Sequence, residues 1–257
     1  MIAALASAQH EALATLPMGR LPGRAQVADA KAAGRAPLDP EHWPRDESWR
    51  AALDAVLAKL EPAAIPPQAQ DAASALAATS SAKVEGIAQS FLSGEVGSAD
   101  AGKAVFVAAA LQVAWTRMAA LLDASDLDPV DRGTCPTCGS PPVAGLIAPG
   151  GTKFGHRHLH CSLCATAWRF VRVRCVNCGS TDKITYRQLA GTSYVRAECC
   201  GNCQSYSKLF YLDTVKVVEP TADDLASLGL DVLVGEEGFS RVPNPFIVGS
   251  MTGPGLS

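Results

Sequence analysis

The residues of this chain whose types and spacing favour chemistry are its cysteines. All nine lie between Cys135 and Cys203, and eight of them form four Cys-x-x-Cys pairs. These pairs are Cys135/Cys138, Cys161/Cys164, Cys175/Cys178 and Cys200/Cys203. A Cys-x-x-Cys turn places two sulfurs on one side of a tight loop, and two such turns complete a tetrahedron around a metal ion. The sequence therefore predicts two four-cysteine metal sites with these eight residues as ligands.

The assignment of the pairs to sites depends on an internal repeat of about 40 residues. One unit opens with Cys135-Pro-Thr-Cys138-Gly-Ser and the other with Cys175-Val-Asn-Cys178-Gly-Ser. The gaps inside the two units are 22 and 21 residues, slightly above the roughly 15–20 residues of a typical zinc ribbon. The 10-residue gap from Cys164 to Cys175 would also close a site. We favour sequential pairing, because both units then match in length and in opening motif.

The turns also make a conformational prediction. Gly139 and Gly179 each follow the second cysteine of their turn, where a left-handed residue is often needed.

The identity of the metal stays open at this stage. Four thiolates in a tetrahedron suit zinc or iron. Zinc is the default for a closed structural site, whereas a single iron would give a rubredoxin-like, one-electron centre. The symmetric spacing disfavours an iron–sulfur cluster. We predict two metal ions, zinc or iron, with one ion in each site.

The chain carries no pattern of export or membrane insertion. The segment from Met1 to Leu16 lacks Lys and Arg and is interrupted by His10 and Glu11. The most apolar later stretch, 104–115, is shorter than the ~20 residues that a membrane span needs. We expect a cytoplasmic protein without a membrane span. Thiols stay reduced in the cytosol, which favours metal ligands over disulfides.

The charge is distributed unevenly along the chain. The net charge is -3 and the pI about 5.9, which argue against a dedicated nucleic-acid binder. From Arg132 to Ala197, however, nine Lys or Arg stand against one acid, Asp182. A divalent ion with four thiolates has a net negative charge, so we interpret the basic excess as compensation together with some partner contact. A patch for an acidic partner or nucleic acid is the alternative.

Three histidines alternate before the second cysteine pair, at His156, His158 and His160. A strand would project all three to one face, where they could serve as spare metal ligands. We favour partly exposed strand histidines, since each site already has four cysteines. Cys199 breaks the pattern, and we interpret it as a bystander thiol rather than a replacement for Cys200.

The sequence contains no arrangement typical of an enzyme. No Ser-His-Asp set, glycine-rich phosphate loop or paired-carboxylate arrangement stands out. Asp223 and Asp224 are better explained as residues of a helix start, where Thr221 and Asp224 resemble a capping box. We therefore assign no catalytic residue and no organic cofactor, and predict that the protein is not an enzyme.

The elements around the cysteines favour an α+β fold. Apolar residues at helical spacing predict four helices in the N-terminal half. Their ranges are 46–60, 68–78, 81–93 and 100–122. Prolines and glycines make residues 17–45 loop-rich, and the acidic stretch 123–133 is a candidate linker.

The cysteine region predicts short strands and one further helix. The strands are expected at 154–160, 168–174, 194–198 and 206–218, and the helix follows Thr221. The predicted division is 1–132 for the helical domain with its loop-rich segment, 133–172 for the first four-cysteine module, and 173–257 for the second module with a C-terminal helix and tail.

Taken in order, the motifs from residue 133 to 247 resemble the formate dehydrogenase accessory proteins of the FdhE type. The resemblance rests on Cys135-Pro-Thr-Cys138-Gly-Ser-Pro-Pro-Val-Ala-Gly, Arg157-His-Leu-His-Cys161-Ser-Leu-Cys164-Ala-Thr-Ala-Trp168, Arg174-Cys175-Val-Asn-Cys178-Gly, Arg196-Ala-Glu198-Cys-Cys200-Gly-Asn-Cys203, Ala222-Asp-Asp-Leu-Ala-Ser-Leu-Gly-Leu-Asp231 and Asn244-Pro-Phe246.

This resemblance implies paired rubredoxin-like modules behind a helical domain. It implies a cytoplasmic maturation factor that binds the catalytic subunit of formate dehydrogenase before export in folded form. It also implies the eight paired cysteines as ligands. The alternatives are a rubredoxin-like electron-transfer protein and, less favoured, a zinc-ribbon nucleic-acid binder.

Overall fold

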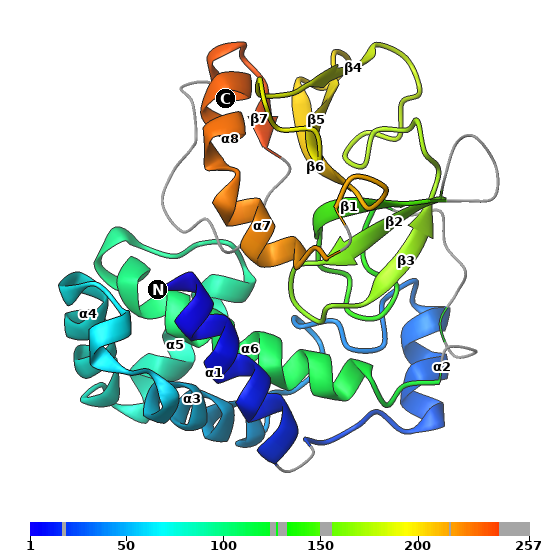
Figure 1. The fold of residues 1–257 in the computed structure, drawn as a ribbon. Coiled ribbons are helices and arrows are strands. Elements are labelled where there is room, and N and C mark those ends of the chain that lie inside the picture. Colours follow the sequence, from blue (N-terminus) through cyan, green and yellow to red (C-terminus); the bar gives the residue numbers. More distant parts are fainter. Residues whose placement is uncertain (17–18, 124–126, 128–132, 150–155, 216, 242–257) are drawn as a thin grey trace. The chain divides into compact units, whose positions relative to one another are not determined.

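The computed structural model describes residues 1–16, 19–123, 127, 133–149, 156–215 and 217–241. They fall into two compact units, one within residues 1–126 and the other within residues 127–244. The first unit is helical and the second contains a β-sheet (Figure 1). Most of the predicted linker at 123–133, and the whole tail from Pro243, lie outside the described residues.

The helical unit is built around α6, Ala101–Ala119, which is buried on most of its surface as its apolar sequence predicts. Helices α1, α3, α4 and α5 pack against it. The other α-helices are α1 Ile2–Thr15, α2 Arg24–Ala32, α3 Ser48–Lys59, α4 Pro67–Ala77 and α5 Ser81–Leu92, and the 3₁₀ turns are η1 Pro62–Ala64 and η2 Ser98–Asp100. All four helices predicted for this half are present.

Helix α2 was not predicted, because residues 17–45 have the composition of a loop. The prolines and glycines of this segment fall outside the nine helical residues. The side chain of Gln26 accepts a hydrogen bond from the backbone N–H of Gly23 at 3.0 Å, which caps the first turn. Val27 and Ala30 are buried. Local capping and burial on one face therefore suffice for a short helix here.

The second unit contains a sheet with the strand order β3-β2-β1-β6-β5-β4, and β7 pairs with β6. The strands are β1 Pro142–Ala148, β2 His156–Cys161, β3 Ala167–Phe170, β4 Ile184–Arg187, β5 Val195–Cys200, β6 Ser205–Tyr211 and β7 Ser240–Arg241. The first three strands form one antiparallel group, and β4, β5 and β6 form a second. Parallel pairing of β1 with β6 joins the two groups into one sheet.

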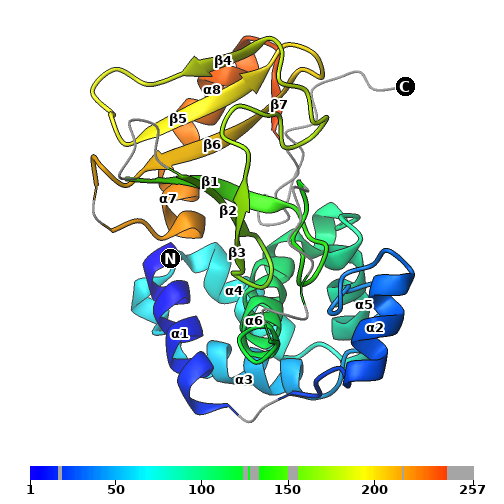
Figure 2. The same ribbon diagram turned by 90° about the vertical axis from the view of Figure 1, so that its right-hand side faces the viewer.

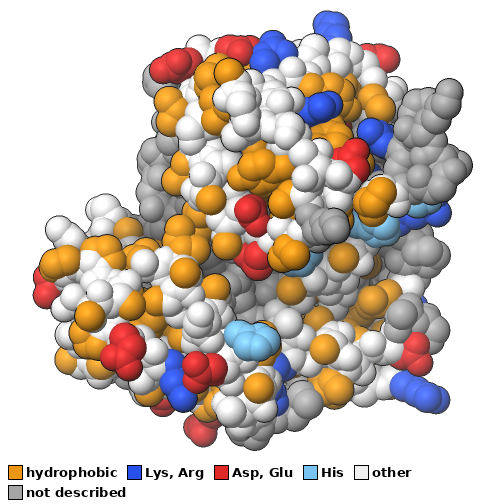
Figure 3. All heavy atoms as spheres, viewed as in Figure 1, with side chains coloured by type: hydrophobic (Ala, Val, Ile, Leu, Met, Phe, Trp, Pro, Cys, Tyr) orange, Lys and Arg blue, Asp and Glu red, His pale blue; other side chains and the backbone are white. Residues whose placement is uncertain are grey.

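Helices α7, Pro220–Ala226, and α8, Leu228–Glu236, lie on one face of this sheet (Figure 2). Leu230 and Val234 of α8 pack into a core with apolar residues of β1, β5 and β6. The outward side chains Leu228, Val232 and Leu233 are exposed. Hydrophobic and acidic side chains are interspersed over α7 and α8 (Figure 3). Among the described residues, no helix combines the length and apolarity that a membrane span requires.

A buried lysine attaches both helices to the sheet. The ammonium of Lys208, on β6, lies 2.5 Å from a carboxylate oxygen of Asp231 on α8 and 3.5 Å from Asp224 on α7. It also donates to the hydroxyl of Ser227 at 2.9 Å. The Lys208 side chain has no exposed surface. The segment Ala222–Asp231 thus surrounds one buried cation with three polar side chains, which accounts for its pattern of residues.

The start of α7 differs from the predicted Thr221/Asp224 capping box. The side chain of Glu219 caps the helix by accepting from the backbone N–H of Ala222. The carboxylate of Asp223 accepts from the backbone N–H of Glu219 at 2.8 Å. Asp223 is therefore a helix-start residue as predicted, whereas Asp224 is fully buried in the ion-pair cluster. Pro220 moves the cap upstream because proline fits the first helical position.

Candidate metal centres

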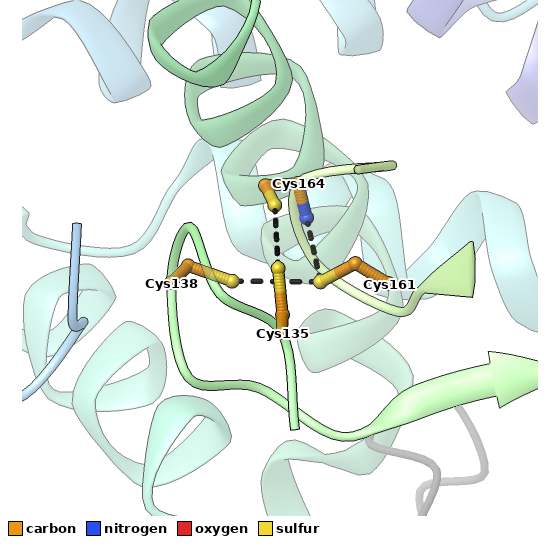
Figure 4. Close-up of side chains that lie close together, drawn as sticks. All are labelled: Cys135, Cys138, Cys161 and Cys164. Carbon is orange, nitrogen blue, oxygen red and sulfur yellow. Dashed lines mark hydrogen bonds between the residues drawn. The ribbon is translucent and has the colours of Figure 1, made fainter. Parts of the chain in front are cut away.

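The first candidate site is formed by two turns that strand pairing brings together. One turn, with Cys135 and Cys138, precedes β1, and the other, with Cys161 and Cys164, lies between β2 and β3. The four sulfurs point toward one another (Figure 4). Sulfur–sulfur distances are 3.5 Å for Cys135–Cys164 and 3.4 Å for Cys138–Cys161.

The second candidate site repeats this construction. Cys175 and Cys178 precede β4, and Cys200 and Cys203 lie where β5 turns into β6. The sulfur–sulfur distances are 3.6 Å for Cys175–Cys203 and 3.7 Å for Cys178–Cys200. Within each set, all four sulfurs lie within 4.8 Å of one another. The structure therefore groups the cysteines in the sequential pairing that the repeat favours.

These distances fit four-thiolate metal sites and exclude disulfides. A disulfide needs a sulfur–sulfur distance of about 2.05 Å, and all nine cysteines are free thiols. Four sulfurs at about 2.3 Å from a central ion would be about 3.8 Å apart, by the geometry of a tetrahedron. The four sulfur–sulfur distances given above, 3.4–3.7 Å, are close to that value. Zinc and iron both suit this donor set.

Backbone N–H groups in the turns point at the sulfurs. The N–H of Thr137 donates to the sulfur of Cys135 at 3.4 Å, and that of Cys164 donates to Cys161 at 3.4 Å. In the second site the N–H of Cys178 donates to Cys175 at 3.5 Å. Such contacts stabilise negative charge on the sulfurs, which ligation of a metal requires.

All four turns place a left-handed residue after the second cysteine. Gly139 and Gly179 have φ of 78° and 73°, as the sequence predicts. Ala165 and Gln204 occupy the same position in the other two turns with φ of 56° and 52°. These two were not predicted, since neither is glycine. Their conformation carries strain that the fold tolerates because the turn geometry is the same in every case.

The two sites differ in solvent exposure. All four cysteines of the first site are buried, whereas Cys178 is exposed and Cys203 is partly exposed. Burial opposes ionisation of Cys203, yet hydrogen bonds from the Ser205 hydroxyl and N–H lower the pKa of its thiol to about 6. The N–H of Ser180 favours the Cys178 thiolate, but partial desolvation and the neighbouring thiols of its site raise the pKa of Cys178 to about 12. A metal ion must therefore displace protons from the second site.

The basic residues near the cysteines do not all serve the sulfurs. The guanidinium of Arg174 donates to the carbonyl of Gly179 at 3.1 Å and so supports a cysteine turn directly. Arg157 instead forms a buried ion pair with Glu198 at 2.8 Å. It also donates to the carbonyl of Arg174 at 3.2 Å. Charge compensation for the thiolates is thus only part of the explanation for the basic excess.

The three histidines share one face of β2, as their alternation predicts. His156 is exposed, and His158 and His160 are half-buried. Burial is the main cause that lowers the pKa of His158 and of His160. None of the three belongs to a group of described residues close enough to share an ion. Cys199 is buried on β5 and belongs to neither four-cysteine group. Burial raises the pKa of its thiol to about 11.

Two hydroxyl groups at the sites were missed by sequence reasoning. Thr166 lies 3.1 Å from the sulfur of Cys164, and Ser205 lies 2.9 Å from that of Cys203. The signal was present in the sequence, because a Ser or Thr occurs two residues after every second cysteine of a pair. These residues are Ser140, Thr166, Ser180 and Ser205.

The fold and the two clusters define an α+β protein with a helical N-terminal region and two zinc-ribbon-like cysteine modules. Family models match the chain as FdhE, N-terminal (residues 1–132), FdhE, central domain (134–172), and FdhE, C-terminal domain (173–247). The chain belongs to the FdhE family.

Individual relatives agree with this assignment. Protein FdhE of Salmonella enteritidis is 37% identical over 249 residues, which cover 95% of this chain and 80% of the relative. The FdhE homolog of Pectobacterium atrosepticum is 42% identical over 217 residues, with 83% and 70% covered. The crystal structure of FdhE from Pseudomonas aeruginosa has a TM-score of 0.84 at 33% identity and covers 95% of this chain and 87% of that one.

Proposed function

We propose that this chain is a non-enzymatic accessory protein for the assembly or maturation of formate dehydrogenase. It acts in the cytoplasm and binds the catalytic subunit before export, as a client-specific chaperone. The observation that carries the proposal is the match to FdhE over nearly the whole chain, with both four-cysteine clusters assembled. In the first cluster the four buried sulfurs point toward one another (Figure 4), as in a structural metal site.

The metal ions have a structural role in this proposal. Each of the eight paired cysteines is a ligand, and each module holds one zinc or iron ion. The modules are small three-stranded groups, and small units of this size commonly depend on a metal for stability. We propose a division into a helical part at 1–132, a first module at 133–172 and a second at 173–257. The ions keep the modules in the shape that the partner recognises.

The test combines capture with complementation. An affinity-tagged chain should recover the catalytic subunit of formate dehydrogenase from its host. Deletion should abolish formate oxidation, and the wild-type chain should restore it. Cys175→Ser should fail to restore it, whereas Cys199→Ser, the matched control at a cysteine outside both clusters, should succeed. No recovered subunit together with intact formate oxidation after deletion would rule out the proposal.

A rubredoxin-like redox function is the second candidate. It is supported by the all-thiolate donor sets and by the N–H groups that point at the sulfurs, which tune iron–thiolate centres. Protein purified without oxygen and then exposed to air would absorb visible light if it contained iron, and would stay colourless with zinc. A nucleic-acid function is less favoured, because the basic residues Arg157 and Arg174 are committed to internal hydrogen bonds.

A further inference from the structure

The hydroxyl groups beside the cysteine clusters follow a rule that the cysteines alone do not explain. Each of the four turns has the form Cys-x-x-Cys-x-(Ser/Thr). Two of the turns join neighbouring strands, β2 to β3 and β5 to β6. In each of these two turns the hydroxyl lies next to the sulfur of the second cysteine. The distances are 3.1 Å from Thr166 to Cys164 and 2.9 Å from Ser205 to Cys203. The same residue position thus makes the same contact in both sites.

The hydroxyl of Ser180 provides the contrast. It occupies the corresponding position after Cys178, but accepts from the backbone N–H of Asp182 at 3.1 Å and from the side chain of Asn202. No contact between the Ser180 hydroxyl and a sulfur is found among the described residues. A hydroxyl at this position therefore does not approach a sulfur by necessity, and the contacts of Thr166 and Ser205 are specific to their turns.

The fold fixes both contacting hydroxyls in place. The backbone N–H of Cys161 donates to the carbonyl of Thr166 at 2.9 Å, and Cys200 pairs with Ser205 in the register of β5 and β6. The left-handed residues Ala165 and Gln204 turn the chain before each hydroxyl. Rigid backbone on both sides holds the oxygen against the sulfur.

The hydroxyls also have connections beyond the nearest sulfur. Ser205 lies 3.8 Å from the sulfur of Cys175, so it is near both turns of its site. Thr166 and Thr137 are 3.1 Å apart through their hydroxyl oxygens. The Thr166 hydroxyl donates to that of Thr137, and a metal-bound Cys164 thiolate, as a charged and therefore stronger acceptor, would compete for the same proton. This chain of hydroxyls links the two turns of the first site.

We propose that Thr166 and Ser205 are positioning residues of the two metal sites. A metal-bound thiolate has no proton and only accepts hydrogen bonds, so in the metal-loaded sites each hydroxyl would donate to its sulfur. The bond withdraws electron density from the sulfur and fixes its orientation toward the ion. Groups of this kind around ligands typically change metal affinity about 10–100-fold when they are removed. The inference rests on the metal sites of the proposed function.

The experiment uses the full chain loaded with cobalt(II), whose sulfur-to-metal absorption bands report on thiolate electron density. Ser205→Ala should shift the band of the second site to longer wavelength and should weaken its metal retention against a chelator about 10–100-fold. Thr166→Val should do the same for the first site. In each variant the unaltered site is an internal reference for folding.

Two control variants distinguish the effect of losing the hydroxyl from the effect of substituting a residue near the site. Ser205→Thr retains the hydroxyl and should restore the wild-type band and retention, while Ser180→Ala should change neither. If Ser205→Ala at full cobalt loading matches Ser180→Ala in both measurements, the inference is overturned and the metal sites stand. If the wild-type chain binds no cobalt, the metal sites and the inference fail together. Capture of the formate dehydrogenase subunit tests the partner separately.

Discussion

Arg157 on β2 and Glu198 on β5 form an ion pair of 2.8 Å across two intervening strands. Their side chains are 0% and 2% exposed. The small residues of the strands between them make this possible. A side chain on Gly145 would come within 3.2 Å of Nε of Arg157. The Ser207 hydroxyl accepts from Nη2 of the same guanidinium at 3.4 Å. Because Arg157 belongs to the first cysteine module and Glu198 to the second, this pair connects the modules.

Arg157→Met should destabilise the sheet by about 3–5 kcal/mol, because it leaves Glu198 buried without its partner. Urea unfolding followed by hydrogen exchange in β2 and β5 measures this loss. The control is Arg187→Met, which breaks the 2.7 Å Arg187–Glu237 pair, where both side chains are about one-third exposed. That loss should stay below about 1 kcal/mol. Equal losses in the two variants would show that the buried pair does not connect the modules.

The Tyr186 hydroxyl donates to Glu198 at 3.1 Å and makes a pH-dependent contribution to stability. Burial, followed by the charge of Glu198, raises the pKa of Tyr186 from 10.0 to about 12. The folded chain therefore keeps this proton after the unfolded chain has lost it, so stability should fall as the pH rises between these two values. Tyr186→Phe should reduce this slope in urea unfolding at alkaline pH. An unchanged slope would contradict the assignment. Tyr194→Phe is the control.

Lys208→Met should release α7 and α8 from the sheet. The substitution removes the buried ammonium from Asp224 and Asp231, which Arg241 also contacts. Loss of one partner from a buried charge cluster costs about 3–5 kcal/mol. Hydrogen exchange should show protection lost in residues 220–236 and kept in α6. Lys183→Met, at an exposed lysine, is the control. Full protection of both helices in Lys208→Met would refute this role.

The left-handed residues of the cysteine turns predict substitutions with opposite effects. Gly179→Ala should destabilise the second module by about 1 kcal/mol, because a side chain disfavours positive φ. Its new Cβ would have the flexible end of Arg174 as its nearest neighbour, at 3.4 Å, so crowding is not the main cause. Gln204→Gly should stabilise the same module by relieving the strain at φ of 52°. Denaturant unfolding of both variants measures the signs, and two changes of the same sign would be inconsistent with this explanation.

The features that could be predicted from sequence are those set by local spacing. The Cys-x-x-Cys turns, the left-handed glycines and the apolar face of α6 each follow from a few neighbouring residues. The repeat also indicated which pairs meet. Arg157 could not be predicted as a buried residue, because its partner Glu198 approaches only when β1 pairs with β6. The burial of Lys208 could not be predicted either, because its partners Asp224 and Asp231 lie on α7 and α8, further along the chain.

The sequence predictions for α2 and for Asp224 differ from the structure for other reasons. Helix α2 was not predicted because the segment 17–45 as a whole is rich in proline and glycine. The nine residues of the helix itself contain neither and suit a helix. Asp223 and Asp224 are adjacent in sequence, yet only Asp223 caps the helix. Successive helical residues point about 100° apart, so one carboxylate meets the helix start and the other meets the core. Which of the two carboxylates is buried depends on the face of α7 that packs against the sheet.

The central claim is that each four-cysteine cluster holds one metal ion. Native mass spectrometry of the chain, purified without added metal or oxygen, together with elemental analysis, tests it most directly. The wild-type chain should carry two ions of zinc or iron, and Cys138→Ser and Cys178→Ser should each carry one. The Cys199→Ser control should keep both. A wild-type chain without metal, or ligand variants that retain both ions, would contradict the account.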